Sequence, residues 1–247
     1  MNVFITGGTT GIGYHLANEF LKNGHRVGIC GRNLSKVDDQ EFKSNENLSM
    51  FEVDVLDREK LINVVKEFAG DDLDIMVANA GVGTGSKTKE PDFENFGWVT
   101  DINIKGVFNS VEACYQIFKN KKKGHIVGVA SVAGFVGTPG ASCYCGSKAA
   151  VIKILESFAC DFKRLNIKVT TICPGFIDTP LTRKNDHDMP FLMSGPKGAK
   201  KIYKAIMKQK RIYVFPWQMN LVMIFLRLIP RSLYVNIMNL KFLNYSK

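Results

Sequence analysis

A glycine-rich turn near the start of the chain constrains its fold more than any other feature. The apolar run of residues 3–6 leads into this turn, and a stretch with Leu16, Phe20 and Leu21 on one helical face follows it. Glycines permit a tight turn and let backbone N–H groups approach a pyrophosphate, while the helix N-terminus favours negative charge. The turn therefore predicts dinucleotide binding, and a plain strand-to-helix loop is the alternative. The residues of the turn expected to bind the dinucleotide are Gly7, Thr9, Thr10, Gly11, Ile12 and Gly13.

The alternation of strand and helix continues along the chain. Apolar runs predict strands at 26–30, 48–53, 73–78, 125–131, 167–173 and 212–215, with helices near 57–69, 93–119 and 142–164. These strands lack a polar face, as expected when helices cover both sides of a parallel sheet. The sequence thus predicts an α/β fold, a Rossmann-type doubly wound parallel sheet in three layers.

The expected organisation is one large domain and a short tail. Residues 1–215 form the dinucleotide-binding and catalytic domain, within which residues 180–197 are rich in Pro, Gly and polar groups. We expect that segment to be mobile and to lie over the substrate. Residues 216–247 change character and predict an apolar, basic helical tail, split by Pro230.

The end of the second strand indicates which nicotinamide cofactor the chain prefers. An acidic residue there would bind the ribose hydroxyls of NAD, but this chain has Gly31 and Arg32. A guanidinium can hold the extra 2′-phosphate of NADP, and no carboxylate repels it. NADP(H) is therefore the expected cofactor and Arg32 its selective contact. NAD(H) stays open, because Arg32 could instead be an ordinary solvated arginine.

Further motifs, in a fixed order, resemble those of the short-chain dehydrogenase/reductase family, in its compact single-domain branch. The turn is similar to the family's TGxxxGxG loop, Tyr144 and Lys148 form its YxxxK motif, and the segment from Pro174 to Thr179 is similar to PGxxxT. The similarity runs over almost all of residues 1–215. Two positions depart from the pattern: Ala78 replaces the first Asn of the NNAG motif, and Thr10 replaces a basic residue frequent in NADP-binding members.

The resemblance implies a role for each matching residue. It places adenine beside Asp54 and Val55, and the adenosine ribose beside Asn79, Ala80 and Gly81. Further cofactor contacts follow from the same resemblance: Tyr144, Lys148, Pro174, Gly175, Ile177 and Thr179. The implied catalytic residues are Asn103, Ser131, Tyr144 and Lys148. Family members are usually dimeric or tetrameric, so a homodimer or homotetramer is expected.

The catalytic residue types suit proton transfer to a carbonyl oxygen. Tyr144 and Lys148 are four residues apart and share one face of a helix. We expect the ammonium to lower the pKa of the phenol from about 10, so that Tyr144 acts as general acid and base. Ser131 can stabilise the carbonyl oxygen, and the resemblance implies that Asn103 holds a relay water. Taken singly, each could be an ordinary helix-surface or turn residue.

An apolar substrate is expected, because the residues near the site are apolar. Phe135, Val136, Phe176, Leu181 and residues 189–193 are the expected lining. The chain is therefore predicted to be an NADP-dependent oxidoreductase that moves a hydride between nicotinamide and a carbonyl or secondary alcohol. The alternative is a nucleotide-bound protein that docks on a membrane or partner, with vestigial redox activity. Epimerase or dehydratase chemistry is disfavoured, because no substantial substrate domain follows residue 180.

The positive charge of the chain is concentrated at its C-terminal end. Residues 189–247 contain eleven Lys and Arg and no acidic residue, and the rest of the chain is nearly neutral. Such a tail indicates a membrane surface or acidic partner rather than nucleic acid. Its longest uncharged run is below the ~20 residues that span a bilayer, so we expect an interfacial helix pair anchored by Trp217, Arg227, Arg231 and Lys241. Burial against the core or a subunit interface is the alternative.

The remaining expectations concern metals and location. The four histidines and six cysteines lack metal-ligand spacing, so no metal site is predicted. An apolar strand starts at Val3, which leaves no room for a signal peptide. A cytoplasmic protein is expected, with peripheral contact at the inner face of a membrane.

Overall fold

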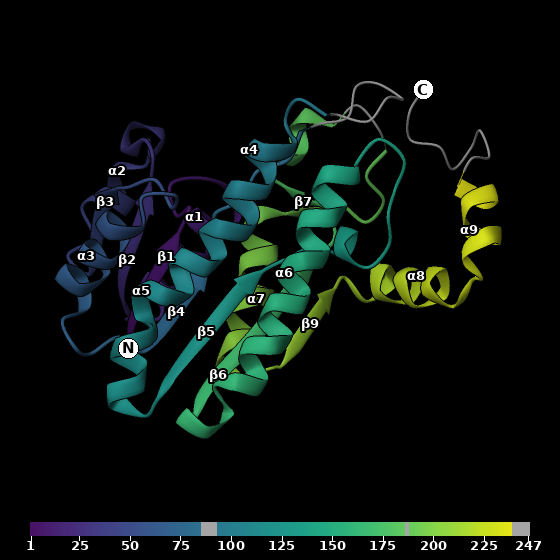
Figure 1. Ribbon diagram of the computed structural model, residues 1–247. Coiled ribbons are helices and arrows are strands. Elements are labelled where there is room, and N and C mark those ends of the chain that lie inside the picture. Colours follow the sequence, from purple (N-terminus) through teal and green to yellow (C-terminus); the bar gives the residue numbers. More distant parts are fainter. Residues whose placement is uncertain (85–92, 186–187, 239–247) are drawn as a thin grey trace.

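The computed structural model describes residues 1–84, 93–185 and 188–238 (Figure 1). Its centre is a seven-stranded sheet in which all neighbouring strands run parallel, in the order β3-β2-β1-β4-β5-β6-β9. The strands are β1 (Asn2–Thr6), β2 (Arg26–Gly31), β3 (Leu48–Glu52), β4 (Ile75–Ala78), β5 (Gly124–Val129), β6 (Ile167–Pro174) and β9 (Ile212–Phe215). Each lies within two residues of a run predicted from the sequence.

Helices cover both faces of the sheet and enclose two separate cores. One core lies between the sheet and helices α1 (Gly11–Lys22) and α7 (Gly195–Met207). The other lies between the sheet and helices α3 (Arg58–Ala69), α5 (Gly106–Lys121) and α6 (Ser142–Asp161). Fully buried side chains such as Phe4 and Ile5 alternate between these cores along β1, because successive strand residues point to opposite faces. The predicted three-layer fold is confirmed.

Shorter elements connect these layers. They are η1 (Leu34–Lys36), α2 (Gln40–Lys43), α4 (Phe96–Thr100), the π-helix η2 (Asp101–Lys105), η3 (Val132–Gly134), η4 (Lys163–Leu165), β7 (Ile177–Asp178), η5 (Thr182–Lys184) and β8 (Met193–Ser194). The long helix expected near 93–119 is thus a continuous run of α4, η2 and α5. Strands β7 and β8 form a small parallel pair outside the main sheet.

The segment 180–197 contains more regular structure than its composition indicates. Of its described residues, η5, β8 and the first turn of α7 have defined secondary structure, and residues 186–187 lie outside the described part. Helix α7 was missed from the sequence. Its signals were Pro196 at the start of the helix and apolar residues at helical spacing, which include Ala199, Ile202 and Ile206. The mobility of the segment stays a prediction.

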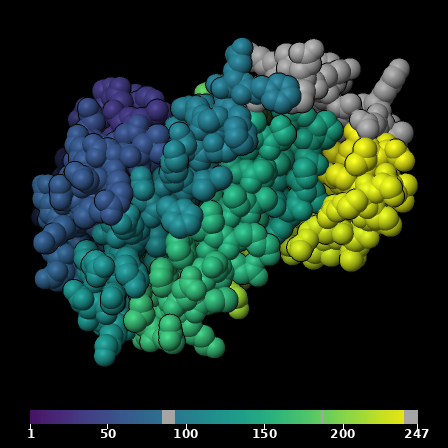
Figure 2. Space-filling model, in the orientation of Figure 1, coloured from purple at the N-terminus to yellow at the C-terminus, as the bar shows by residue number. Residues whose placement is uncertain are grey.

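Two helices follow the last strand, as the predicted tail requires. They are α8 (Trp217–Leu228) and α9 (Arg231–Met238), and they form one flank of the molecule (Figure 2). Met219, Met223, Tyr234 and Met238 pack against Val132 and Val136 in a third apolar cluster. Lys241, one of the expected anchors, lies outside the described residues. Within the described chain, no helix has the length and apolar character to cross a bilayer.

The position of β1 determines where a ligand can bind. The chain places β2 and β3 on one side of β1 and then continues on the other side with β4. Connections leave the carboxyl ends of β1 and β4 in opposite directions, which opens a crevice between them. The glycine-rich turn follows β1 directly and therefore lies at this crevice.

Candidate active site

The glycines of the first turn leave no room for side chains. Gly7 and Gly11 have φ values of +66° and +58°, which only glycine adopts readily. A Cβ atom on Gly7 would lie 2.8 Å from the Cα of Ala80, and one on Gly13 would lie 2.3 Å from the carbonyl oxygen of Gly7. The backbone of the turn is therefore packed tightly on β4 and on itself, which leaves its outer side free for a ligand.

Asn79 holds the turn against the end of β4. Its Nδ2 atom donates to the carbonyl oxygens of Thr6, at 2.9 Å, and Gly7, at 3.1 Å. The hydroxyl of Thr6 in turn accepts from the backbone N–H groups of Asn79 and Ala80. The amide therefore fixes the shape of the turn from behind. Ala78, the departure from the family motif, is a buried residue of β4.

The residues expected to hold the cofactor line a single cleft of about 240 Å³. Gly13 is the exception, because it is buried beneath the turn. The others all line the cleft: Gly7, Thr9, Thr10, Gly11, Ile12, Arg32, Asp54, Val55, Asn79, Ala80, Gly81, Tyr144, Lys148, Pro174, Gly175, Ile177 and Thr179. Residues far apart in the sequence thus form one continuous surface, although their contacts with a cofactor stay a prediction.

A second cation, missed from the sequence, lies at the Arg32 end of this cleft. Lys36 and Asn33 line the cleft beside Arg32. The Oδ1 atom of Asn33 accepts from the backbone N–H of Ser35 at 2.8 Å and caps η1, the short helix that carries Lys36. An Asn directly before a short helical turn is an N-cap signal that could have indicated this placement.

Lys148 is buried between the cleft and the sheet. It is 4% exposed, and its Nζ atom donates to the carbonyl oxygen of Val129 at 3.0 Å. Nζ lies 5.8 Å from the centre of the Tyr144 ring. Burial lowers the pKa of Lys148 to about 8, and the nearby Cys173 thiol acts in the opposite direction. The amine can therefore change charge close to neutral pH.

Tyr144 is half-buried, and its phenol is hydrogen-bonded to the Ser131 hydroxyl. Burial raises the pKa of Tyr144 to about 12, which outweighs the lowering effect of Ser131. The expectation of a lowered pKa is therefore wrong for this structure. The physical reason is that the Lys148 amine bonds to the backbone of Val129, while burial disfavours the phenolate.

Asn103 lies behind the cleft, within the π-helix η2. Its side chain is fully buried, and it exchanges two hydrogen bonds with the backbone of Val82, at 2.8 and 2.9 Å. Its Nδ2 atom also donates to the hydroxyl of Ser147 at 2.9 Å, and that hydroxyl donates to the carbonyl oxygen of Tyr144 at 2.8 Å. Asn103 and Ser147 therefore position the first turn of α6. The relay water expected at Asn103 stays a prediction.

A second cavity, of about 200 Å³, adjoins the cofactor cleft. Ser131 and Tyr144 line both, together with Gly175, Leu181 and Thr182. The described residues that line the second cavity are all uncharged, and most of the surface they present is apolar. The hydroxyl groups of Ser131 and Tyr144 thus lie where a dinucleotide and an apolar molecule could meet.

The walls of the second cavity differ in part from the expected ones. Val136, Phe176 and Leu181 line it as expected, but Phe135 and residues 189–193 do not. Phe135 instead packs towards the core, beneath the guanidinium of Arg227 at 5.4 Å from its ring centre. Two methionines of α8, Met219 and Met223, line the cavity although the sequence did not indicate them.

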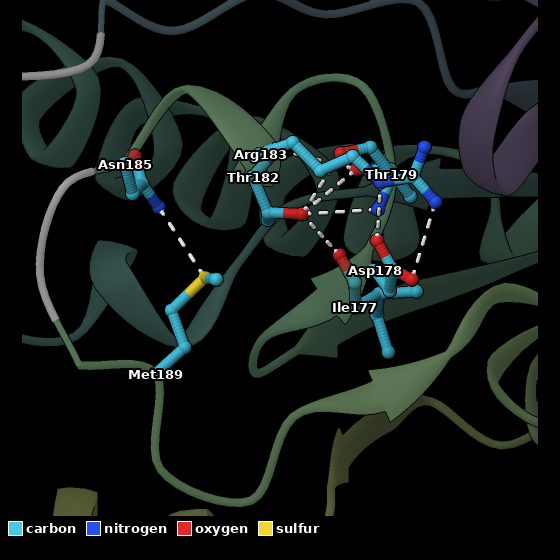
Figure 3. A network of polar contacts seen from close by, with 7 residues as sticks. All are labelled: Ile177, Asp178, Thr179, Thr182, Arg183, Asn185 and Met189. Atoms are coloured by element: carbon cyan, nitrogen blue, oxygen red, sulfur yellow. Dashed lines mark hydrogen bonds and ion pairs between the residues drawn. The ribbon is translucent and has the colours of Figure 1, made fainter.

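A network of side chains shapes the segment between the two cavities (Figure 3). The hydroxyl of Thr182 accepts from the backbone N–H of Thr179 at 3.0 Å and donates to the carbonyl oxygen of Ile177. Arg183 binds Asp178 with two hydrogen bonds, of 2.7 and 3.2 Å. Thr179 is therefore held within a tight turn after β7, and Arg183 is engaged with Asp178 rather than with the second cavity.

The doubly wound sheet, the glycine turn at its crevice and the Ser-Tyr-Lys group between two cavities define an oxidoreductase of the dinucleotide-binding class. Residues 1–190 match the family model described as short chain dehydrogenase. The chain belongs to the short-chain dehydrogenase/reductase family, whose members bind nicotinamide cofactors and act on small molecules.

Known proteins similar to this chain agree with that assignment. An uncharacterized oxidoreductase of Myxococcus xanthus is 31% identical over 235 residues, which cover 93% of each chain. The solved structure of ElxO with NADP bound is 29% identical, with a TM-score of 0.77, and covers 86% of this chain and 96% of its own. A 3-ketoacyl-ACP reductase from Sinorhizobium meliloti is 25% identical, with a TM-score of 0.77 over 90% of this chain and all of its own.

Proposed function

We propose that the protein is an NADPH-dependent reductase of apolar ketones or aldehydes, which can also oxidise the corresponding alcohols. One observation carries this proposal: Ser131 and Tyr144 line both the dinucleotide cleft and a cavity whose described lining is uncharged, with the buried Lys148 beside them. A protein that only bound a nucleotide would not need these three side chains at the junction of two cavities.

The cleft suits NADP(H) in shape and in charge. The glycine turn is held closely against the protein behind it, where added Cβ atoms would clash, and its free outer side lies at the N-terminus of α1. Arg32 and Lys36 place two cations at the other end, where a 2′-phosphate would lie. When bound there, the nicotinamide supplies or accepts the hydride. The similar ElxO structure contains NADP, which supports the same preference here.

The side chains at the junction are suited to handle the proton. The Ser131 hydroxyl can donate a hydrogen bond to a carbonyl oxygen and stabilise the negative charge that develops there. A phenol with a pKa of about 12 stays protonated at neutral pH, so Tyr144 is ready to give its proton to that oxygen. Lys148, with a pKa of about 8, can become fully charged and so stabilise the phenolate left behind.

The decisive experiment follows NADPH oxidation with a panel of apolar ketones and aldehydes. Tyr144→Phe should lower kcat by about 10²- to 10⁴-fold, because the proton donor is lost, and should leave NADPH binding intact. Tyr115→Phe, on α5 and outside both cavities, is the matched control and should retain activity. If the wild-type protein binds NADPH but turns over none of these compounds, the vestigial, binding-only alternative replaces the proposal.

Cofactor choice is tested separately, by titration of NADPH and NADH into the protein. The double substitution of Arg32→Ala and Lys36→Ala should raise the Kd for NADPH by about 10- to 100-fold, which corresponds to about 1.4 to 2.8 kcal/mol. It should leave the Kd for NADH unchanged, because NADH lacks the 2′-phosphate. Lys60→Ala, on α3, is the control. An equal effect on both dinucleotides would contradict the preference for NADP.

The proposal includes a homodimeric or homotetrameric assembly in the cytoplasm. Family membership supports the assembly. Sedimentation of the full chain measures it directly, and a monomer would contradict it.

A further inference from the structure

Helix α8 has two apolar faces, and the protein covers one of them. Met219 and Met223 are buried on the inner face, where they form a wall of the substrate cavity. The outer face is exposed and carries five large apolar side chains: Trp217 at 67%, Leu221 at 55%, Ile224 at 47%, Phe225 at 66% and Leu228 at 78%. These recur at spacings of three and four residues, so they form one continuous stripe along the helix.

This outer stripe lies on the flank of the molecule that Figure 2 shows for α8 and α9. Leu233 and Val235 of α9 are also exposed, at 50% and 55%, and extend the apolar character along the tail. An apolar face of a helix normally packs against another part of the protein. A contiguous exposed patch of this kind marks a surface that binds a partner or a membrane.

The charges around the stripe favour a lipid surface. The only charged side chains between residues 216 and 238 are Arg227 and Arg231, and the whole stretch 189–247 has no acidic residue. Basic residues beside an apolar helix face attract anionic lipid headgroups while the apolar side chains enter the acyl boundary.

We propose that the outer face of α8 binds an anionic lipid surface, and that the apolar substrate passes from the lipid to the cavity behind the helix. The inner face supports the second part, because the helix that would touch the lipid also forms the cavity wall. Methionine side chains are flexible and can adapt to an elongated apolar molecule. The second part rests on the proposed reductase function, whereas the first does not.

Vesicle flotation of the full chain tests the first part. The protein should float with vesicles of phosphatidylcholine mixed with phosphatidylglycerol, and added salt should weaken this binding. The double substitution of Leu221→Ser and Phe225→Ser should reduce the bound fraction by at least about tenfold, since two apolar side chains that would enter the lipid are lost. The matched control removes two exposed apolar side chains elsewhere, Phe108→Ser on α5 and Met207→Ser on α7, and should float as the wild type does.

Each other outcome overturns the docking proposal. It fails if the wild type stays in the soluble fraction with both pure phosphatidylcholine and the anionic mixture. It fails equally if the double variant of α8 floats as well as the wild type. If that variant instead becomes a smaller oligomer in sedimentation, with no difference in flotation, the stripe is an interface between copies.

Steady-state kinetics test the delivery of substrate. The α8 variant should raise KM for a long-chain ketone carried in anionic vesicles, by about tenfold in line with its lost binding, and should leave kcat and KM for a short, water-soluble ketone unchanged. Delivery from the lipid is overturned if the α8 variant and the wild type have the same KM for the vesicle-borne ketone, or if the variant raises KM equally for both ketones. Flotation needs no turnover, so the lipid-docking result stands or falls independently of the reductase activity.

Discussion

Removal of one buried hydroxyl should loosen the attachment of helix α6. Ser147 is 1% exposed, and it links Asn103 of the π-helix to the Tyr144 carbonyl in the first turn of α6. In Ser147→Ala one N–H of Asn103 loses its partner in a fully buried place. The carbonyl of Tyr144 is less affected, because it also belongs to the hydrogen-bonding ladder of the helix.

The magnitude follows from these contacts. An unsatisfied buried N–H costs about 1 to 3 kcal/mol, and the lost serine hydrogen bond adds about 1 kcal/mol. We therefore expect the free energy of unfolding to fall by about 2 to 4 kcal/mol, measured as a lower urea midpoint at an unchanged slope. Activity should fall as well, since the first turn of α6, which carries Tyr144, is held less firmly. Ser142→Ala, the same change at an exposed site of α6, should stay within about 0.5 kcal/mol of the wild type.

A double-mutant cycle identifies the source of the loss. If the unpaired amide of Asn103 is the cause, Asn103→Ala with Ser147→Ala should cost less than the sum of the single changes, by about 1 to 2 kcal/mol. The reasoning is refuted if Ser147→Ala unfolds at the same urea concentration as Ser142→Ala, or if the two single effects simply add.

Three further predictions follow from backbone packing, titration and cavity shape. Gly134→Ala places a Cβ atom 2.7 Å from the backbone carbon and oxygen of Lys148. The free energy of unfolding should therefore fall by at least about 2 kcal/mol, measured as a lower melting temperature. Gly137→Ala, in open space, is the control and should leave the melting temperature nearly unchanged. Burial lowers the pKa of His125 from 6.5 to about 4, so the unfolded state binds more protons between these values. Stability should drop by up to roughly 3 kcal/mol as pH falls through this window; a His125→Gln variant with the same pH dependence would contradict this. Met223→Ala should lower KM for bulkier ketones relative to small ones, because it removes part of the cavity wall; an unchanged ratio would argue against that wall.

Local patterns were sufficient to predict the fold. The strands are continuous apolar runs separated by helical spacing, and for such strands the topology rules leave few arrangements. The cofactor cleft could be predicted equally well, because its residues follow the ends of strands and come together once the sheet forms. Lys36 was missed because its position depends on a short capped turn, and α7 because the Pro and Gly near its start also indicate a loop.

Other features depend on contacts that no local pattern contains. The cavity wall formed by Met219 and Met223 requires α8 to return from the edge of the sheet to η3. The pKa of Tyr144 depends on burial and on where the Lys148 amine points, and a four-residue spacing specifies neither. The spacing correctly placed both residues at one site but could not give the balance between burial and charge.

The methionine wall has a consequence for how such chains diversify. The family model ends at residue 190, and every described residue that lines the cofactor cleft comes before that point. Met219 and Met223 come after it. Substitutions in roughly the last eighth of the polypeptide can therefore reshape the second cavity without changing the described residues of the cofactor cleft, so substrate range and redox chemistry can evolve as separable traits.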